Sequence, residues 1–157
     1  MSVSDSVERV RAALLALGHA DTITMFAEGT RTAQDAANAV GCTVAQIAKS
    51  VVLRAGERVV LVIASGANRV DLAKIAARLG QPVQPAEGRW VRDNTGFAIG
   101  GVSPVGHAVA PRIFIDADLM ALDPVWAAAG SPRHVFRTSA AQLLRMTAGE
   151  VADVKET

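Results

Sequence analysis

The fold of this chain is decided by the stretch SVVLRAGERVVLVIA, residues 50–64. Its first five residues, SVVLR, form a β-branched run that predicts a strand. The AGE triplet turns the chain into a second, largely buried strand, RVVLVIA, so the two strands predict a β-hairpin. A doubly wound parallel fold needs regular alternation of strands and helices, and this pair of adjacent strands departs from it.

Both helices and strands are predicted on either side of this hairpin. Helical spacing of apolar residues and capping residues predict helices over residues 5–17, 32–41, 71–80 and 140–147, with one or two helical turns over 43–50 and a short helix within 81–96. Further strands are predicted at residues 23–26, 97–99, 112–119, 124–130 and 134–139. The sequence therefore predicts a mixed sheet with helices on its outside, in the α/β or α+β class. We expect residues 1–149 to form one domain and the polar end, EVADVKET (150–157), to fray.

Composition excludes several classes of protein. The 157 residues suit one domain, and the 50% of hydrophobic residues can fill a core without a metal or disulfide. The single cysteine excludes an internal disulfide and indicates a reducing cytoplasm. The three histidines are far apart, so neither a metal nor a cofactor is expected. The N-terminal helix carries charges, and no run of about 18 apolar residues exists, so we expect no signal peptide and no membrane span.

The net charge of the chain is only +1. Proteins that grip many phosphates usually carry a strongly basic face. If this protein binds nucleic acid, we expect a small footprint or help from another protein.

The stretch GFAIGGVSPVGH, residues 96–107, contains a loop that carries almost no side chain. Gly100 and Gly101 allow another group to approach the backbone closely, and Pro104 restricts Ser103 and stiffens the exit of the loop. One reading is an ordinary tight turn between strands. The other is a rigid backbone wall lining a pocket.

Two ionisable residues are candidates for chemistry. Lys49 lies in QIAKSVVL among apolar neighbours, where it either extends its ammonium to water or holds a phosphate or carbonyl oxygen as a point charge. His107 is a general base, a substrate partner or a structural histidine, and no triad partner is evident for it.

The remaining polar candidates have structural explanations. An inert thiol is expected at Cys42, which follows a helix stop and has no base nearby in sequence. Asp116 and Asp118 lie toward the end of a predicted strand, and capping of the strand end explains them better than metal binding. The locally basic SPRHVFR, residues 131–137, is typical of a solvated face.

Five blocks of sequence, taken in order, resemble the YbaK family, the free-standing relatives of the editing domain of bacterial prolyl-tRNA synthetase. The blocks are IAKSVVL (47–53), IASGANRVDLAKIA (63–76), GFAIGGVSPVGH (96–107), IFIDADL (113–119) and VWAAAGSPRHVF (125–136). The resemblance extends over about residues 30–147. It implies a curved, mixed β-sheet flanked by helices.

The resemblance also implies an activity, trans-editing, and a set of site residues. Family members hydrolyse the ester between a wrong amino acid and the 3′-terminal adenosine of a tRNA, typically tRNA(Pro) carrying alanine, cysteine or another small residue. Lys49 matches the family's functional lysine, and the stretch from Gly100 to Pro104 matches its Gly-x-x-x-Pro loop. The expected catalytic residues are Lys49, Gly100, Gly101 and His107, and the expected substrate-binding residues are Val102, Ser103, Pro104, Gly130 and Ser131. At Gly130 and Ser131 the sequence departs from the Ser-Gly-Gly of several relatives, which leaves the amino acid removed open.

The expected mechanism is positioning, with backbone N–H groups of Gly100, Gly101 and Val102 binding the ribose or an oxyanion while a water attacks, helped by a substrate hydroxyl. The expected partner is the acceptor end of a mischarged tRNA, and prolyl-tRNA synthetase or an elongation factor is a candidate second partner. Two alternatives stay open: a module that only binds aminoacyl-adenosine or a nucleotide, and a hydrolase of another small ester.

Overall fold

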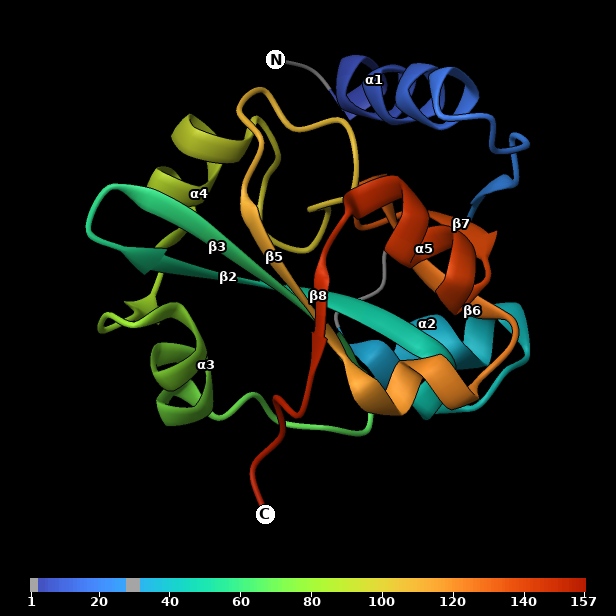
Figure 1. Cartoon of the computed structure of the whole chain (residues 1–157). Coiled ribbons are helices and arrows are strands. Elements are labelled where there is room, and N and C mark those ends of the chain that lie inside the picture. Colours follow the sequence, from blue (N-terminus) through green and yellow to red (C-terminus); the bar gives the residue numbers. More distant parts are fainter. Residues whose placement is uncertain (1–2, 28–31) are drawn as a thin grey trace.

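The computed structural model describes residues 3–27 and 32–157. Within them, eight strands form one mixed sheet in the order β1-β7-β6-β2-β3-β5-β8, with β4 paired to β2. The strands are β1 (Ile23–Met25), β2 (Ile47–Ala55), β3 (Arg58–Ser65), β4 (Gln84–Pro85), β5 (Arg112–Asp116), β6 (Val125–Ser131), β7 (His134–Thr138) and β8 (Glu150–Ala152). The helices are α1 (Val3–Ala16), α2 (Ala33–Val40), α3 (Leu72–Leu79), α4 (Gly88–Thr95) and α5 (Ala140–Thr147), with 3-10 turns η1 (Val44–Gln46) and η2 (Ala117–Ala121). The predicted mixed sheet flanked by helices is confirmed (Figure 1).

The predicted hairpin is confirmed as the antiparallel pair β2 and β3, with a register that runs from Ala48↔Ser65 to Ala55↔Arg58. Each strand of the hairpin also has a parallel neighbour, β6 beside β2 and β5 beside β3. The hairpin therefore lies at the centre of the sheet, and its two long strands cross the molecule in Figure 1.

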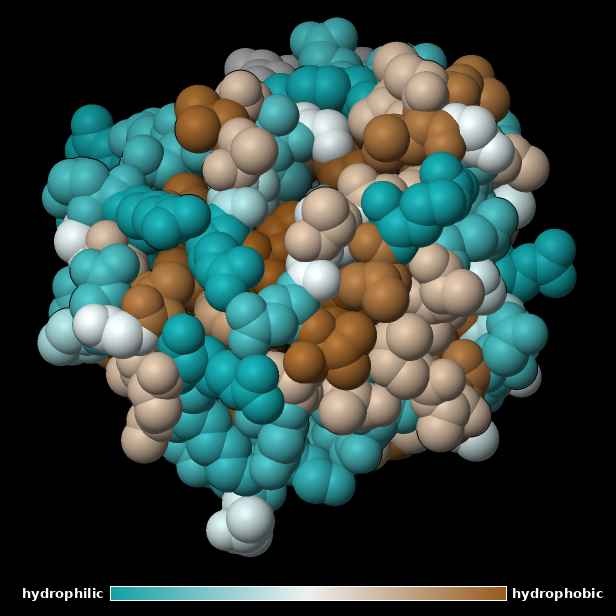
Figure 2. Space-filling view, viewed as in Figure 1, coloured by the Kyte–Doolittle hydropathy of each residue, from teal (hydrophilic) through white to brown (hydrophobic). Residues whose placement is uncertain are grey.

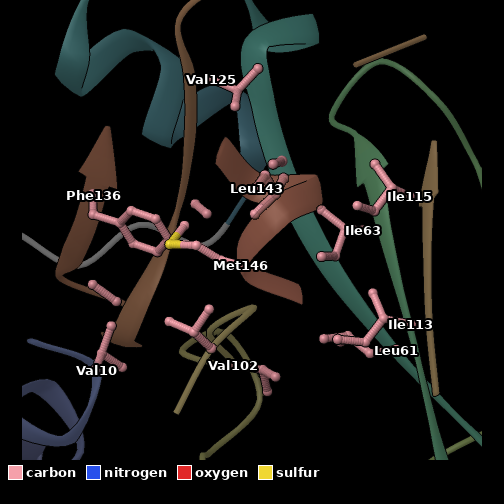
Figure 3. Packing of buried hydrophobic residues seen from close by; sticks show 14 of the residues in the cluster. Val10, Leu61, Ile63, Val102, Ile113, Ile115, Val125, Phe136, Leu143 and Met146 are labelled. Atoms are coloured by element: carbon pink, nitrogen blue, oxygen red, sulfur yellow. The ribbon is translucent and has the colours of Figure 1, made fainter. Parts of the chain in front are cut away.

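Both faces of the central sheet are buried. Leu61 and Ile63 of β3 belong to a cluster that α1, α5 and the loop after α4 complete, and Val10, Val102 and Phe136 converge there in Figure 3. The alternate residues of β3 belong to a second cluster on the opposite face, which packs under α3. The members of β3 in that second cluster are Val60, Val62 and Ala64. Fully burying one Val, Leu, Ile or Phe side chain is worth about 1.5–3 kcal/mol, so these two clusters are the main source of stability.

Capping residues set the helix ends as the sequence predicts. The side chains of Thr32, Asp71 and Ser139 accept hydrogen bonds from backbone N–H groups in the first turns of α2, α3 and α5. Gly41 and Gly80 end α2 and α3 in the left-handed conformation.

The strand expected at residues 97–99 is wrong. Gly96 ends α4 in the left-handed conformation, and the chain then bonds locally instead of entering a sheet. The Phe97 N–H donates to Thr95 Oγ1, and the Gly101 N–H donates to Ala98 O. The segment is therefore a loop that buries Phe97 and exposes Ile99.

The fraying expected for residues 150–157 is also wrong. Glu150–Ala152 form β8, which pairs in parallel with Phe114–Asp116 of β5. Val154 is fully buried, and Lys155 Nζ donates to Asp118 Oδ2 at 2.8 Å. Strand pairing and burial thus hold this segment in place, although its polar composition predicted fraying. The folded unit therefore extends beyond residue 149.

The face shown in Figure 2 is polar over most of its left and lower margin, while apolar side chains gather near its centre, over β8 and α5. Leu144 of α5 and Val151 of β8 are only partly buried there, at the edge of the first cluster. None of the helices described by the structure is long and apolar enough to span a bilayer.

Candidate functional site

A cavity opens where β2 and β6 part. The two strands pair in parallel only at Ile47↔Trp126 and Ala48↔Ala127, and the next residues of each strand line the space between them. The cavity has a volume of about 240 Å³. Its walls come from β2, the start of α2, the loop after Ile99 and the β6–β7 turn, and the lining includes Thr32, Lys49, Gly100, Val102, Ser131 and His134.

Lys49 is the cation of this cavity. It is the third residue of β2, half-buried, and no hydrogen bond or ion pair joins its Nζ to the rest of the described chain. Burial, followed by the positive charge of Arg69, lowers the pKa of Lys49, while Asp116 acts weakly in the opposite direction. An ammonium that is partly desolvated and lacks a partner within the described residues is a strong candidate for binding an anionic or polar ligand.

Only part of the Gly-x-x-x-Pro loop faces the cavity. Gly100 and Val102 line it, whereas Gly101, Ser103 and Pro104 are not among the lining residues. The Ser103 hydroxyl is buried and accepts a hydrogen bond from the Val105 N–H at 3.1 Å. Ser103 thus shapes the loop from within and does not present its hydroxyl to a ligand.

Close packing against neighbouring backbone explains why residues 101 and 130 are glycines. A Cβ on Gly101 would lie 2.7 Å from Ser131 Cα, and one on Gly130 would lie 2.7 Å from Ser6 O in α1. The close approach anticipated for a ligand at Gly101 is therefore made by the neighbouring β6–β7 turn. The N–H of Gly101 also donates to Ala98 O at 3.0 Å, so it is already hydrogen-bonded within the loop.

His107 stands behind the loop and does not line the cavity. Its Nε2 lies 2.6 Å from Ser103 O, and its ring meets that of Phe97 edge-on with centroids 5.3 Å apart. Burial lowers the pKa of His107, so the neutral ring donates from Nε2 to the carbonyl. Of the three roles considered for His107, this position fits the structural one, in which the ring holds the loop.

Ser131 and His134 form a polar pair on the cavity wall. The Ser131 Oγ accepts a hydrogen bond from the Arg133 N–H at 3.0 Å and lies 2.6 Å from His134 Nδ1. The contact with the hydroxyl orients the imidazole ring through its Nδ1. Burial and the nearby guanidinium groups of Arg11 and Arg133 lower the pKa of His134.

Sequence reasoning missed several residues of the cavity. His134 lies in the locally basic segment that was expected to be a solvated face, and Trp126 was treated only as part of a strand. The Ser50 hydroxyl is buried without a hydrogen-bond partner among the described residues, and Ser50 also lines the cavity. The one available signal was position, since Ser50 adjoins Lys49 and Trp126 precedes the second loop by four residues.

The other polar candidates prove structural. Asp116 Oδ2 accepts from the Ser65 N–H at 3.0 Å and from Asn68 Nδ2 at 2.8 Å, and Asp116 Oδ1 accepts from the Asp118 N–H at 2.9 Å. The strand-end cap is thus confirmed for Asp116, whereas Asp118 Oδ2 accepts from Asn68 Nδ2 and from Lys155 Nζ, each at 2.8 Å. Burial raises the pKa of the Cys42 thiol, as suits an unreactive cysteine. No group of three or more potential metal ligands occurs in the described part of the chain.

Comparisons with known proteins agree with this geometry. A family model described as an aminoacyl-tRNA editing domain matches residues 27–146. A crystal structure of a candidate trans-editing enzyme for prolyl-tRNA synthetase is 43% identical, with a TM-score of 0.92 over 97% of this chain and 98% of that one. A scaffold protein used for computational grafting of linear epitopes is 41% identical, with a TM-score of 0.92 over the same shares of the two chains.

A relative from Bacillus subtilis (strain 168), the protein YwhH, is 28% identical over 147 residues, which cover 93% of this chain and 94% of that protein. The matched family region contains Lys49, the glycine loop and the β6–β7 turn, so it holds the whole cavity. The resemblance of the sequence to the YbaK type of editing domain is confirmed. This chain belongs to the aminoacyl-tRNA editing domain family and is an aminoacyl-tRNA deacylase.

Proposed function

We propose that this deacylase acts in trans on tRNA(Pro) carrying a small non-cognate amino acid, with alanine and cysteine as the first candidates. The observation that carries the proposal is the Lys49 ammonium, which has no partner within the described chain and faces a small cavity edged by Gly100. The similarity at 43% identity to a candidate trans-editing enzyme for prolyl-tRNA synthetase supports tRNA(Pro) as the substrate.

Lys49 binds the phosphate of the terminal adenosine. A lysine ammonium acts as a compact point charge with three donors, which suits a phosphate oxygen. The lowered pKa of Lys49 shows that the protein alone gives this charge little compensation, so an anionic ligand relieves an existing electrostatic cost.

The loop supplies the oxyanion site through Gly100 and Val102. Both residues line the cavity, and no hydrogen bond within the described part of the chain engages either N–H. Preorganised backbone donors of this kind stabilise the negative charge that develops on the carbonyl oxygen of an ester under attack.

The reaction is a simple ester hydrolysis. The oxygen of a water attacks the acyl carbon, and the bond from that carbon to the ribose oxygen breaks. One proton of the water passes to the ribose oxygen, the other is released to solvent, and the amino acid leaves as a carboxylate. The neighbouring ribose hydroxyl of the substrate orients the water, or the thiol does so in a cysteinyl ester. An activated ester needs positioning more than a covalent nucleophile.

Selectivity for small acyl groups follows from size. A volume of about 240 Å³ is below the range of about 300–1,000 Å³ typical of ligand pockets, and the lining includes Ala127, Ala128 and Val102. One methylene is worth only about 1–3 kcal/mol in such a pocket, which is why a synthetase benefits from a second selection step.

The near-neutral charge of the chain fits a footprint limited to the acceptor end. We propose that a complex with prolyl-tRNA synthetase or an elongation factor supplies any selection among tRNAs that the small domain lacks.

Deacylation of a tRNA panel under single-turnover conditions tests the proposal. The panel holds tRNA(Pro) charged with alanine, cysteine, serine or proline, and alanyl-tRNA(Ala). We expect release of one small non-cognate residue from tRNA(Pro) and none of proline. Hydrolysis of small aminoacyl esters without hydrolysis of any charged tRNA would favour a different ester substrate, and binding without any hydrolysis would favour a recognition module.

A further inference from the structure

We propose that the outer surface of β6 and β7 is a binding track for the single-stranded 3′ end of the tRNA, in which Trp126 stacks on the terminal adenine and Arg137 binds the preceding phosphate. This inference rests on the proposed function, because it assigns places to the nucleotides that precede the ester.

Trp126 and Arg137 lie side by side across the sheet. They are direct cross-strand partners in the antiparallel pair of β6 and β7, so their side chains project from the same face. Ile47 of β2 is the partner of Trp126 on its other side. Lys49 lies two residues beyond Ile47 on β2 and therefore projects from that same face.

Trp126 is packed on one side and open on another. It contacts the small cluster formed by α2 and Ile47, yet it remains only partly buried and lines the cavity that holds Lys49. An indole fixed in this way offers a stacking surface for a base. Alanine substitution of such aromatic residues costs about 1–3 kcal/mol per stacked base.

A second hollow lies at Arg137, the cross-strand partner of Trp126. It has a volume of about 370 Å³, and its lining includes Thr22, Arg137, Thr138, Ser139 and Gln142. Trp126 borders the first cavity and its cross-strand partner Arg137 borders the second. In this proposal, the two hollows hold successive nucleotides that precede the ester.

Arg137 is the positive charge of this second hollow. Its side chain is exposed, and no ion pair engages its guanidinium within the described residues. Asp123 lines the same hollow, and its negative charge repels a phosphate. It therefore weakens the attraction between Arg137 and the phosphate. Single-stranded RNA is commonly held by this combination of aromatic stacking and arginine–phosphate contacts.

The test measures binding through the fluorescence of Trp126. Trp90, the other tryptophan, is 9% exposed on α4 beneath the Arg54 guanidinium, so a Trp90→Phe protein isolates the signal of Trp126. The probes are adenosine 5′-monophosphate and the RNA trinucleotide CCA. We expect both to quench the fluorescence, and CCA to bind more tightly.

Variants separate the two contacts. In equilibrium binding of fluorophore-labelled CCA, Trp126→Leu should weaken affinity by about 5- to 100-fold, the range that stacking of one base allows. Arg137→Gln should weaken CCA several-fold, lower the salt dependence by about one phosphate contact, and leave adenosine 5′-monophosphate unchanged. Asp123→Asn should strengthen CCA. Arg58→Gln, which removes an exposed charge at the far end of the hairpin, is the matched control and should change neither probe.

Deacylation by the full-length variants completes the test. We expect Trp126→Leu and Arg137→Gln to raise KM for the charged tRNA, whereas Arg58→Gln should leave it unchanged. If the wild-type protein deacylates tRNA(Pro) but these variants keep its KM and its CCA affinity, the track is wrong and the proposed function stands. If the wild-type protein leaves every tRNA acylated, the proposed function itself fails.

Discussion

The Ser131 hydroxyl lies 2.6 Å from Nδ1 of His134, and both side chains line the cavity that contains Lys49. The hydroxyl is fixed in turn by the Arg133 N–H, at 3.0 Å. This arrangement orients the imidazole through its Nδ1.

Replacing Ser131 by alanine should therefore remove the hydrogen bond that orients His134 while leaving the imidazole itself in place. We expect kcat/KM for the charged tRNA to fall by about 5- to 10-fold, the value of about one hydrogen bond. Deacylation kinetics measure the loss, and Ser131→Thr, which keeps the hydroxyl, is the control. Unchanged turnover in a folded Ser131→Ala protein would show that the pair has no part in the reaction.

Lys49→Ala should lower deacylation by about 100-fold or more without unfolding the protein, because Lys49 has no partner within the described chain whose loss would destabilise it. Thermal unfolding provides the control for folding. A folded variant that retains wild-type turnover would contradict the role given to the lysine.

The pH profile should report the ionisation of Lys49. Because burial lowers its pKa, the ammonium loses its proton at a lower pH than an ordinary lysine, and binding of the phosphate should weaken as pH rises through that value. Binding of adenosine 5′-monophosphate between pH 7 and 10.5 measures this limb. Lys49→Arg keeps the charge throughout and should remove the limb; a limb that persists in this variant would assign the titration to another group.

Gly101→Ala tests whether the two loops must touch. The added methyl would lie 2.7 Å from Ser131 Cα and 2.8 Å from Ser131 N, so the β6–β7 turn must move. Overpacking of this kind costs about 1–3 kcal/mol, and we expect activity to fall with stability. Gly56→Ala, at the hairpin turn where a Cβ meets nothing within 4 Å, should cost stability through its positive φ but leave activity intact. Equal activity losses in the two variants would argue against a role for the loop contact.

His107 should behave as a residue that holds the loop. We expect His107→Ala to lose the bond to Ser103 O and the packing on Phe97, with a larger effect on stability than on the chemical step. Its lowered pKa also means that the unfolded chain binds more protons below about pH 6.5, so stability should fall on acidification. The variant should flatten this dependence in part, since His134 shifts in the same direction. A loss of activity as complete as that of Lys49→Ala, at unchanged stability, would make His107 catalytic.

The sequence was most informative where local chemistry dictates structure. The β-branched run SVVLR forms the predicted strand, and the caps Thr32, Asp71 and Ser139 each act within a few residues of the helix that they begin. The strand predicted at residues 97–99 is wrong because their apolar side chains fit a strand and a buried loop equally well. The hydrogen bonds donated by the Phe97 and Gly101 N–H groups exclude a strand, and they depend on the turn at Gly96. Burial of the polar C-terminal segment depends on β5, more than 30 residues away in the chain, and no local pattern records it.

The residues of the candidate site also divide into those that the sequence predicted and those that it did not. Lys49, Gly100, Val102 and Ser131 were expected from the sequence and meet in one cavity. Gly101 and Gly130 were expected at the ligand but serve the contacts between segments. Trp126 and His134 were missed because their roles follow from the register of β6 with β2 and β7, which the sequence alone does not specify.

The central claim is that Lys49 and its cavity clear a small wrong amino acid from tRNA(Pro). The most direct measurement is the single-turnover rate of release of alanine and of proline from tRNA(Pro), with wild-type and Lys49→Ala protein. The account predicts rapid release of alanine by the wild-type protein alone, with prolyl-tRNA(Pro) spared by both. Equal release of alanine and proline, or release of alanine that survives the loss of Lys49, would contradict it.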